Sequence, residues 1–181
     1  MRIKDAEKNA LEMSRKAEQF QIAAMEDGLT GLYNRKAFDL RVKKAFEAFY
    51  ENKEPFSLVI FDVDNFKEIN DNFGHVAGDK VLIKVAQCMQ ETFRKNDFIA
   101  RFGGDEFAVI IDGLTRELAN ERIFNFRENL NRRRFMSYAK GDVKIKVSTG
   151  IAIAQERDTI ESLIERADQV MYAAKEARKE K

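Results

Sequence analysis

Residues 101–107 read Arg101-Phe102-Gly103-Gly104-Asp105-Glu106-Phe107 and join two short apolar runs, at 98–100 and 107–111. Paired glycines between strand-like runs predict a tight β-hairpin with a turn of the primed type. Two acids, Asp105 and Glu106, then stand at the tip of the hairpin. Adjacent carboxylates repel each other, so this tip favours a site that meets a cation or a cationic substrate. A solvated turn is the alternative.

Composition predicts one globular domain with an appendage. The chain has 181 residues, 44% of them hydrophobic, which is enough for one well-buried core and too few for two domains of ordinary size. Thirty-two basic residues stand against 31 acidic ones, a net charge of +1. No global field therefore attracts nucleic acid or an anionic membrane, and we expect neither as a partner.

Cysteine usage and hydropathy predict a cytoplasmic protein. The single cysteine, Cys88, excludes an internal disulfide framework and multi-cysteine metal sites, which fits a reducing compartment, and we expect its thiol to be buried. The longest apolar runs hold about five residues, far fewer than the ~20 that cross a bilayer. The charged N-terminus lacks the apolar core of a signal peptide, so we predict no membrane segment within this chain.

The N-terminal stretch carries a heptad pattern. Small and apolar residues recur every seven positions in two series, Ile3, Ala10, Ala17 and Ala24 and then Ala6, Met13 and Phe20. Such a seam favours a coiled coil that pairs two copies of the chain. A lone helix folded onto the domain is the alternative, supported by Leu11 and Ile22 off the seam. We therefore divide the chain into an N-terminal signalling helix at 1–26 and a domain at 27–181.

Helix and strand patterns alternate along the domain. The first expected element is a helix that is terminated by Asn52 and Pro55, followed by a strand at 56–61 and a helical segment through Asn70. A loop at 74–79 and a helix at 81–93 then lead into the hairpin. After the hairpin we expect a helix at 118–130, a strand at 145–153 with one buried face and a last helix at 163–174. This order resembles a split βαβ, ferredoxin-like α+β fold, an antiparallel sheet with helices on one face.

Topology predicts where the acids meet. The strand that ends at Asp62 would lie centrally, with its C-terminal end close to the hairpin tip. Asp62, Asp105 and Glu106 would then bring three carboxylates to one edge of the sheet, enough hard oxygen ligands for one or two Mg²⁺ or Mn²⁺ ions. Strict strand alternation sends Asp105 and Glu106 to opposite faces, so which is ligand and which is base stays open. Asp64 is expected to cap the following helix.

Three polar residues near that helix suit a nucleotide. Lys67 falls in its first turn, where a cation is unhelpful to the helix dipole and more useful to an anion such as phosphate. Asn70 and Asp79 can read a donor–acceptor edge such as that of guanine. The stretch 74–80 lacks the spacing and the hydroxyl of a phosphate-cradling Walker loop, which argues against a Walker-type ATPase.

Six stretches resemble, in order, the successive signatures of the GGDEF family, the diguanylate cyclases. They are Asp27 to Arg35, Phe61-Asp62-Val63-Asp64-Asn65-Phe66-Lys67-Glu68-Ile69-Asn70-Asp71, Phe73-Gly74-His75, Gly78-Asp79, Arg101 to Phe107 and Ala167-Asp168 through Lys175. The resemblance runs from about residue 26 to the end of the chain. It implies a fold of the nucleotide-cyclase or polymerase-palm type.

The resemblance implies that the domain condenses two GTP molecules into cyclic di-GMP and releases two pyrophosphates. Each domain of a homodimer would hold one GTP, and the 3′-hydroxyl of one would attack the α-phosphate of the other. Such domains usually follow a sensor domain. A non-catalytic receptor for GTP or cyclic di-GMP is the alternative function.

The resemblance also implies roles for matching residues. Asp62, the Val63 carbonyl and Asp105 would bind Mg²⁺, with Glu106 as a further ligand or base, and Lys67 would stabilise the transition state. The substrate would be held by Asn70, His75, Asp79, Gly103, Gly104 and Lys175. The family usually ends its last helix with Lys-x-x-Gly-Arg-Asn, whereas here Lys175 is followed by Glu176-Ala177-Arg178-Lys179, so Lys179 or Arg178 would supply the second cation.

Arg94-Lys95-Asn96-Asp97 matches the family's inhibitory Arg-x-x-Asp site in type and spacing, five residues before the hairpin glycines. The resemblance implies that the product would bind there, and a planar guanidinium suits phosphate and guanine alike. The alternative is a helix C-terminal arginine followed by an aspartate that starts a strand. We expect feedback inhibition by cyclic di-GMP through Arg94 and Asp97.

Overall fold

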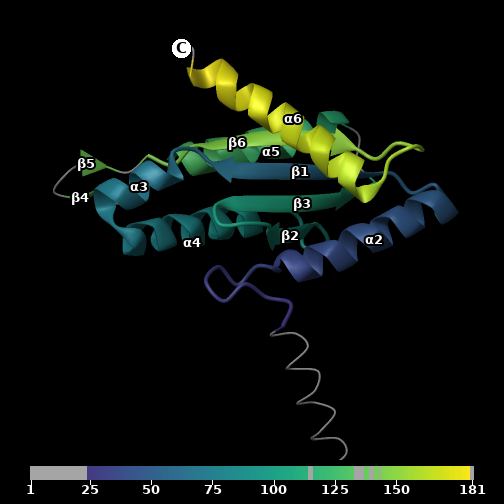
Figure 1. Cartoon of the computed structure of the whole chain (residues 1–181), viewed down its shortest axis with the longest axis horizontal. Helices are drawn as coiled ribbons and strands as arrows, with labels where there is room; N and C mark the ends of the chain where they lie inside the picture. The colour runs from purple at the N-terminus through teal and green to yellow at the C-terminus, as the bar shows by residue number, and fades with distance from the viewer. Residues whose placement is uncertain (1–23, 114–115, 133–136, 139–140, 143, 180–181) are drawn as a thin grey trace, which may run out of the picture.

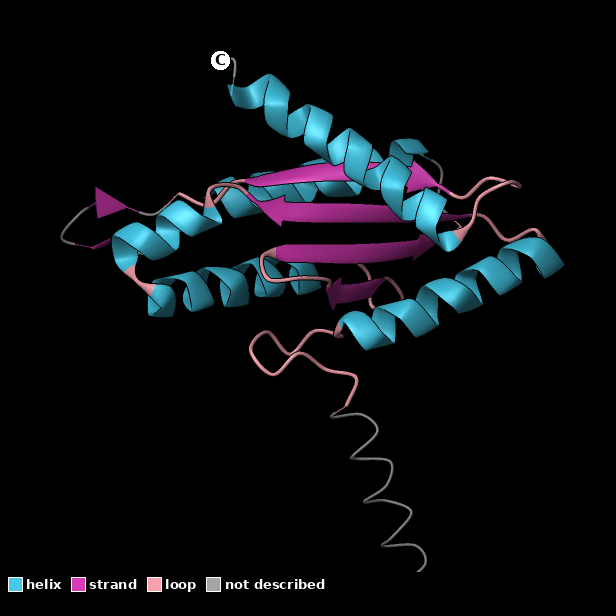
Figure 2. Cartoon of the chain, viewed as in Figure 1, coloured by secondary structure: helices cyan, strands magenta, loops and turns pink. Residues whose placement is uncertain are grey.

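The computed structural model describes residues 24–113, 116–132, 137–138, 141–142 and 144–179. Its centre is a four-stranded antiparallel sheet in the order β2-β3-β1-β6, flanked by a two-stranded hairpin, β4-β5 (Figures 1 and 2). The strands are β1 (Phe56–Val63), β2 (Phe98–Arg101), β3 (Glu106–Asp112), β4 (Ser137–Tyr138), β5 (Gly141–Asp142) and β6 (Val147–Ile153). The central position of β1 confirms the predicted split βαβ order. The N-terminal helix predicted at 1–26 lies almost wholly outside the described residues.

Helices cover both faces of the sheet, so the prediction of helices on one face was wrong. The described helices are α2 (Arg35–Asn52), α3 (Phe66–Phe73), α4 (His75–Thr92), α5 (Arg116–Arg132) and α6 (Ile160–Lys179). The helices α3, α4 and α5 connect strands of the sheet and pack on one of its faces. The helices α2 and α6, which come before the first strand and after the last strand along the chain, pack on the other face. In Figure 1, α6 crosses in front of the sheet and α5 lies behind it.

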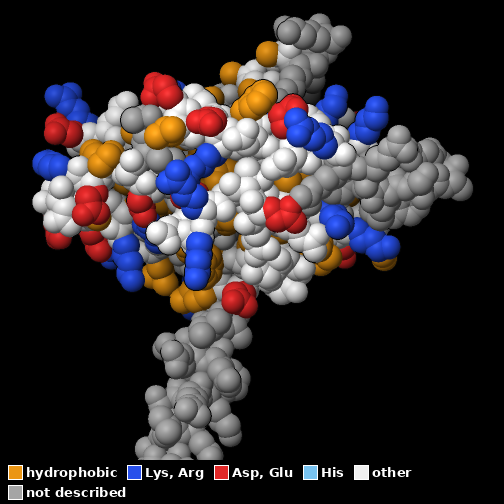
Figure 3. Space-filling view, turned by 180° about the vertical axis from the view of Figure 1, so that it is seen from behind, with side chains coloured by type: hydrophobic (Ala, Val, Ile, Leu, Met, Phe, Trp, Pro, Cys, Tyr) orange, Lys and Arg blue, Asp and Glu red, His pale blue; other side chains and the backbone are white. Residues whose placement is uncertain are grey.

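Side chains of β1 alternate between the two cores. Val59 and Phe61 belong to the core under α4 and α5, and Leu58 and Ile60 to the core under α2 and α6. The thiol of Cys88 is buried in the first core, as predicted. No helix among the described residues is long and apolar enough to cross a bilayer. Acidic and basic side chains are intermingled on the face shown in Figure 3.

Strand β6 is buried on both faces, although the sequence predicted only one buried face. Ser148 and Ala152, which face α6, are as buried as Val147 and Ile151 on the other side. A Cβ at Gly150 would overlap the carbonyl oxygen of Ala167 and lie 2.5 Å from a backbone nitrogen of α6. Small residues on this side of β6 therefore let α6 cross close to the sheet.

The predicted loop at 74–79 is also wrong, because α4 begins at His75. Gly74 alone separates α3 from α4, and it adopts a φ of 84°, a value that favours glycine. Gly78 lies within the first turns of α4 and does not interrupt it. The side chains that follow Gly74 are therefore displayed on a helix.

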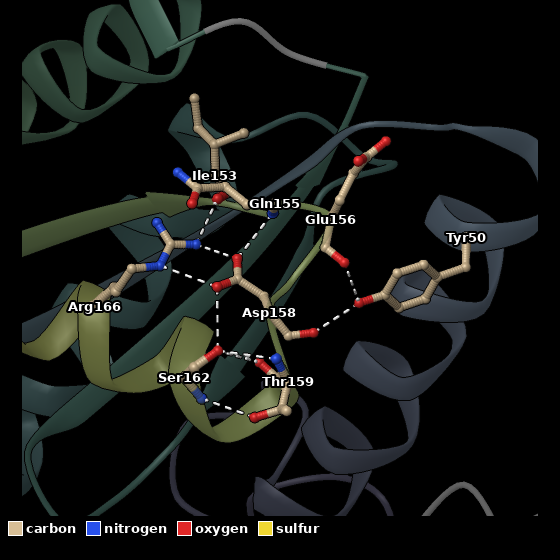
Figure 4. Close-up of polar contacts among 8 residues, drawn as sticks. All are labelled: Tyr50, Ile153, Gln155, Glu156, Asp158, Thr159, Ser162 and Arg166. Carbon is tan, nitrogen blue, oxygen red and sulfur yellow. Dashed lines mark hydrogen bonds and ion pairs between the residues drawn. The ribbon is translucent and has the colours of Figure 1, made fainter.

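A polar network fixes the start of α6 against the end of α2 (Figure 4). The carboxylate of Asp158 accepts hydrogen bonds from the Arg166 guanidinium, the Ser162 hydroxyl and the backbone N–H of Gln155. The Tyr50 hydroxyl donates to the Asp158 carbonyl at 2.7 Å. Because one largely buried carboxylate holds three partners, the start of α6 is fixed in position. The later residues of α6 reach the edge of the sheet from this fixed point.

Candidate active site

The hairpin predicted from the paired glycines is present, but its turn is not of the primed type. β2 ends at Arg101 and β3 begins at Glu106, and neither Gly103 nor Gly104 has the positive φ that a primed turn requires. The backbone N–H groups of Phe102 and Gly103 both donate to the Glu106 carbonyl, at 2.8 and 3.2 Å. A Cβ at Gly103 would lie 2.5 Å from Glu106 Oε2, so this glycine makes room for the carboxylate.

Three acidic residues lie at the same end of the sheet, as the topology predicts. Asp62 of β1 is directly opposite Glu106 of β3 in the register, which puts both side chains on the α6 face. The Val63 N–H donates to the Asp105 carbonyl at 3.1 Å, so Asp105 adjoins the end of β1. No group of three or more His, Cys, Asp or Glu side chains in the described part of the chain is already arranged to hold a metal.

Burial and the repulsion of neighbouring carboxylates raise the pKa values of Asp105 and Glu106. Burial is the largest cause for Asp105, followed by the charge of Asp62. For Glu106, burial comes first and the charges of Asp168, Asp62 and Asp105 follow. The pKa of Asp168, on α6, is itself raised by burial. The carboxylates at this edge therefore repel one another, and a bound cation would relieve that repulsion.

Asp168 was not predicted as a site residue. It lies seven residues before Lys175, which is about two helical turns, so the two share one face of α6. That spacing could have indicated that Asp168 faces the same edge of the sheet. The charge of Arg35, at the first position of α2, opposes the rise in the pKa values of both Glu106 and Asp168 without reversing it. Its guanidinium carbon lies 3.8 Å over the Phe102 ring.

Two predicted site residues contact each other directly. Lys175 of α6 donates from Nζ to Asp62 Oδ1 at 2.6 Å. The Asp62 side chain is 14% exposed and that of Lys175 is 32% exposed, so the pair is partly shielded from water. The residue predicted to bind a substrate phosphate thus holds the residue predicted to bind the metal.

The donor set at this edge fits Mg²⁺ or Mn²⁺. These ions prefer carboxylate and carbonyl oxygens together with substrate phosphates. Asp62, Asp105 and Glu106 offer carboxylates, and the carbonyl of Val63 lies at the end of the same strand. The repulsion among the carboxylates is the physical reason why a divalent cation would stabilise them.

Asp64 does not cap α3 as predicted. The residue before the helix is Asn65, which has a positive φ of 57° and makes no side-chain cap hydrogen bond. The Asp64 carboxylate instead accepts a hydrogen bond from the Ser148 hydroxyl at 2.6 Å. Lys67 is the second residue of α3 and is exposed, so its ammonium group stands at a helix N-terminus where an anion would be favoured.

The predicted guanine-reading residues lie where α3 and α4 meet. Among the described residues, Asn70 Oδ1 has no hydrogen-bond partner although it is buried. A Cβ at Gly78 would overlap this oxygen and lie 3.0 Å from Asn70 Cγ. His75 and Asp79 are exposed one turn apart on α4. A buried acceptor without a donor suits a ligand that supplies N–H groups, as the pairing edge of guanine does.

A residue from another helix, which was not predicted as part of the site, contacts the predicted inhibitory turn. The Asp97 carboxylate accepts from the Arg94 backbone N–H at 2.8 Å and forms an ion pair with Arg122 of α5. The Arg94 side chain is exposed and lines a cavity of about 270 Å³. Tyr33, from the segment that precedes α2, lines the same cavity. Spacing alone could not reveal Arg122, because it comes from a different helix.

The end of α6 departs from the family pattern in the way the sequence indicates. The helix continues through Lys179 without a glycine. The side chains of Arg178 and Lys179 lie outside what the structure describes, so the predicted role of Lys179 stays a prediction.

A split βαβ sheet with an acidic hairpin beside its central strand defines a palm-like α/β domain. Residues 24–181 match the family model described as diguanylate cyclase, GGDEF domain. The chain therefore belongs to the GGDEF family.

Several proteins are similar over most of the chain. Diguanylate cyclase DgcP of Pseudomonas aeruginosa is 36% identical over 177 residues, which are 97% of this chain and 26% of that protein. Probable diguanylate cyclase DgcC of Escherichia coli strain K12 is 32% identical over 169 residues, 93% of this chain and 45% of that protein. The chain thus spans less than half of either relative.

A solved structure is also similar. It is the crystal structure of the coiled coil and GGDEF domain of DgcB from Caulobacter crescentus in complex with c-di-GMP. The TM-score is 0.91 at 31% identity, covering 97% of this chain and 93% of that chain.

Proposed function

We propose that this chain is a Mg²⁺-dependent diguanylate cyclase that condenses two GTP molecules into cyclic di-GMP and two pyrophosphates. The observation that carries the proposal is the position of Asp62 opposite Glu106. Asp105 lies beside them, because its carbonyl accepts a hydrogen bond from the Val63 N–H at the end of β1. Phosphoryl transfer depends on positioning and on neutralising charge, and this edge offers acidic ligands beside cationic side chains.

Different residues of the chain would bind the guanine base and the phosphates of GTP. The amide of Asn70 and the carboxylate of Asp79 would hold the guanine edge, and His75 would contact the same nucleotide. Lys67 at the start of α3 and Lys175 on α6 would contact phosphate oxygens, with Gly103 and Gly104 leaving space for the phosphates to approach the hairpin. Asp62, Asp105, Glu106 and the Val63 carbonyl would hold the metal, which neutralises charge on the reacting phosphates.

The reaction needs two copies of the domain. One 3′-hydroxyl must attack a phosphate held by another domain, so two half-sites would face each other in a homodimer. The heptad pattern at 1–26 supports pairing through a coiled coil, and the similar DgcB structure also contains a coiled coil. A sensor domain upstream would then control how the two domains meet.

Feedback inhibition would act through the cavity beside Arg94 and Asp97. DgcB was crystallised with c-di-GMP. Here the exposed Arg94 guanidinium can bind phosphate or stack on a base, while Arg122 holds the Asp97 carboxylate in place.

Incubation of the protein with GTP and Mg²⁺, followed by chromatography for cyclic di-GMP, tests the proposal. We expect product from the wild type and a loss of at least about a hundredfold in Asp62→Asn, the scale for one preorganised electrostatic contact. Asp112→Asn is the matched control, because Asp112 lies at the opposite end of β3 and is exposed. Bound cyclic di-GMP without turnover, also when the N-terminus is fused to a strong dimeriser, would favour a receptor instead.

A further inference from the structure

The Asp62 carboxylate forms an ion pair with Lys175 and is also a proposed ligand of the metal ion. The Nζ of Lys175 lies 2.6 Å from Asp62 Oδ1 in a partly shielded position. A divalent cation on the same carboxylate would stand only a few ångströms from the ammonium group, and the two positive charges would repel strongly. Metal and lysine are therefore competitors for Asp62.

Lys175 serves more than one acid at this edge. Its positive charge also lowers the pKa of Asp105, which burial and the charge of Asp62 raise. The lysine thus acts as a counter-ion for two of the carboxylates that the metal would need. Its removal would leave these two negative charges to repel each other, which strengthens the attraction for any other cation.

A nucleoside triphosphate would favour metal binding, because its phosphate oxygens can replace Asp62 as the ion-pair partner of Lys175. Lys175 sits on α6, whose start is fixed by the Asp158 network (Figure 4), so its long side chain can change partner while the helix stays in place. Moving the ammonium group from Asp62 to a phosphate frees the carboxylate for the metal, and the number of ion pairs is preserved.

We infer that Lys175 is an internal competitor of the metal ion, which holds Asp62 until a nucleoside triphosphate draws the lysine away, so that metal and nucleotide bind cooperatively. This inference rests on the proposed function for the identity of the nucleotide. Its core, the competition between lysine and metal, concerns only residues of this chain.

The test is a Mn²⁺ titration of the full chain without nucleotide, in which free Mn²⁺ is followed by electron paramagnetic resonance. Lys175→Met removes the charge and keeps an unbranched helix-forming side chain. We expect it to bind Mn²⁺ about tenfold more tightly than the wild type, equivalent to ~1.4 kcal/mol. Lys175→Arg should bind as the wild type does, because it keeps the positive charge. Asp62→Asn should lose this binding, which assigns it to the site.

Lys44→Met, at an exposed position of α2, controls for the loss of one positive charge. Circular dichroism confirms that each variant is folded. Equal Mn²⁺ affinity in Lys175→Met and wild type, weaker affinity in the variant, or no saturable binding by either protein would overturn the inference.

A second titration adds a GTP analogue with a methylene bridge between the α- and β-phosphates. In the wild type the analogue should raise Mn²⁺ affinity, and in Lys175→Met this gain should shrink by about the same tenfold factor, as linkage requires. Cyclic di-GMP production is measured separately on the wild type. A protein that shows the lysine effect without nucleotide but forms no product would reject the proposed activity and leave the competition standing.

Discussion

Arg101, at the end of β2, holds Asp27 at the start of the domain: its Nη1 donates to both carboxylate oxygens, each at 3.2 Å. The same guanidinium donates from Nε and Nη2 to the Gly104 carbonyl, at 3.2 and 2.7 Å. The two side chains are 18% and 20% exposed. One cation therefore ties the entry to the domain to the hairpin that carries the acids.

We expect Asp27→Asn to lower the free energy of unfolding by about 1–2 kcal/mol near neutral pH, toward the low end of the ~1.5–3 kcal/mol for hydrogen bonds to a charged group, because the pair is partly exposed. Burial alone would raise the pKa of Asp27, but hydrogen bonds from Thr30 and the charge of Arg101 lower it below its ordinary value overall. A depressed carboxylate stabilises the fold above its unfolded pKa and loses that effect as pH falls through its folded pKa.

Thermal unfolding of wild type and Asp27→Asn should thus differ at pH 7, and the difference should shrink as the pH falls below ~3.9, the ordinary pKa of an aspartate. Asp39→Asn is the control, since Asp39 pairs with Arg35 on the surface and is 56% exposed. A difference that persists unchanged at acid pH would show that the charge of Asp27 is not what stabilises the fold.

Gly78→Ala should weaken GTP binding without weakening the fold. The added Cβ overlaps Asn70 Oδ1, the far end of a flexible side chain, so the amide turns away and the backbone stays in place. Alanine inside α4 adds up to about 1 kcal/mol of helix preference, which offsets the crowding. We expect KM for GTP to rise about tenfold, equivalent to ~1.4 kcal/mol of lost binding.

Measuring KM, kcat and unfolding on the same preparations separates these effects. Inosine triphosphate, which lacks the 2-amino group, should lose less affinity than GTP in Gly78→Ala. Equal losses for both nucleotides would mean that Asn70 does not contact the 2-amino group of guanine.

Gly150→Ala should destabilise the protein through the backbone. The new Cβ meets the Ala167 carbonyl and the Met171 nitrogen, neither of which can move unless α6 moves. Overpacking of this kind costs about 1–3 kcal/mol. Gly28→Ala is the control, because a Cβ at Gly28 meets nothing within 4 Å. Urea unfolding of the two variants checks the difference; a Gly150→Ala protein as stable as the control would show that α6 does not approach β6 this closely.

Arg94→Ala should relieve inhibition by cyclic di-GMP and leave the initial rate near that of the wild type. The Arg94 side chain is exposed at the cavity, while its backbone N–H still holds Asp97. Asp97→Ala is a poorer probe, since it also releases Arg122. Initial rates measured against added cyclic di-GMP give the inhibition constant, and we expect it to rise at least about tenfold, the equivalent of ~1.4 kcal/mol. Unchanged inhibition would move the product site elsewhere.

The order of elements and the meeting of Asp62 with the hairpin could be predicted because both follow from chain order. A strand that is followed by a helix, a hairpin and another helix has few ways to form a sheet, and the split βαβ arrangement puts β1 beside β3 and so Asp62 opposite Glu106. The face that each helix covers could not be read in this way. The apolar stripe of α2 or α6 shows that one side is buried but does not name the face it covers.

Local errors had local causes. The pair Gly103-Gly104 suggested positive φ, whereas Gly103 serves to make room for the Glu106 carboxylate. Gly78 suggested a loop, whereas its role is close approach between two helices. The Lys175–Asp62 contact is invisible in sequence, because the two residues are 113 positions apart and only their charges suggest that they could pair.

Asp168→Asn should shift the acidic limb of the pH–activity profile to lower pH. Burial is the largest cause of the raised pKa of Glu106, and the charge of Asp168 comes next. Removing that charge lets Glu106 ionise at lower pH, so kcat/KM should be retained further into acid. The plateau at alkaline pH should fall by much less than the hundredfold expected of Asp62→Asn, because the variant keeps every proposed metal ligand.

Asp168→Asn should also change the stability of the fold, and the direction of that change follows from the raised pKa of Asp168. A carboxylate with a raised pKa binds its proton more tightly in the folded state, so its ionisation destabilises the fold as pH rises. In the presence of a chelator at pH 7, Asp168→Asn should therefore melt at a higher temperature than the wild type. An acidic limb that does not move, together with an unchanged melting temperature, would mean that Asp168 exerts no electrostatic effect on Glu106.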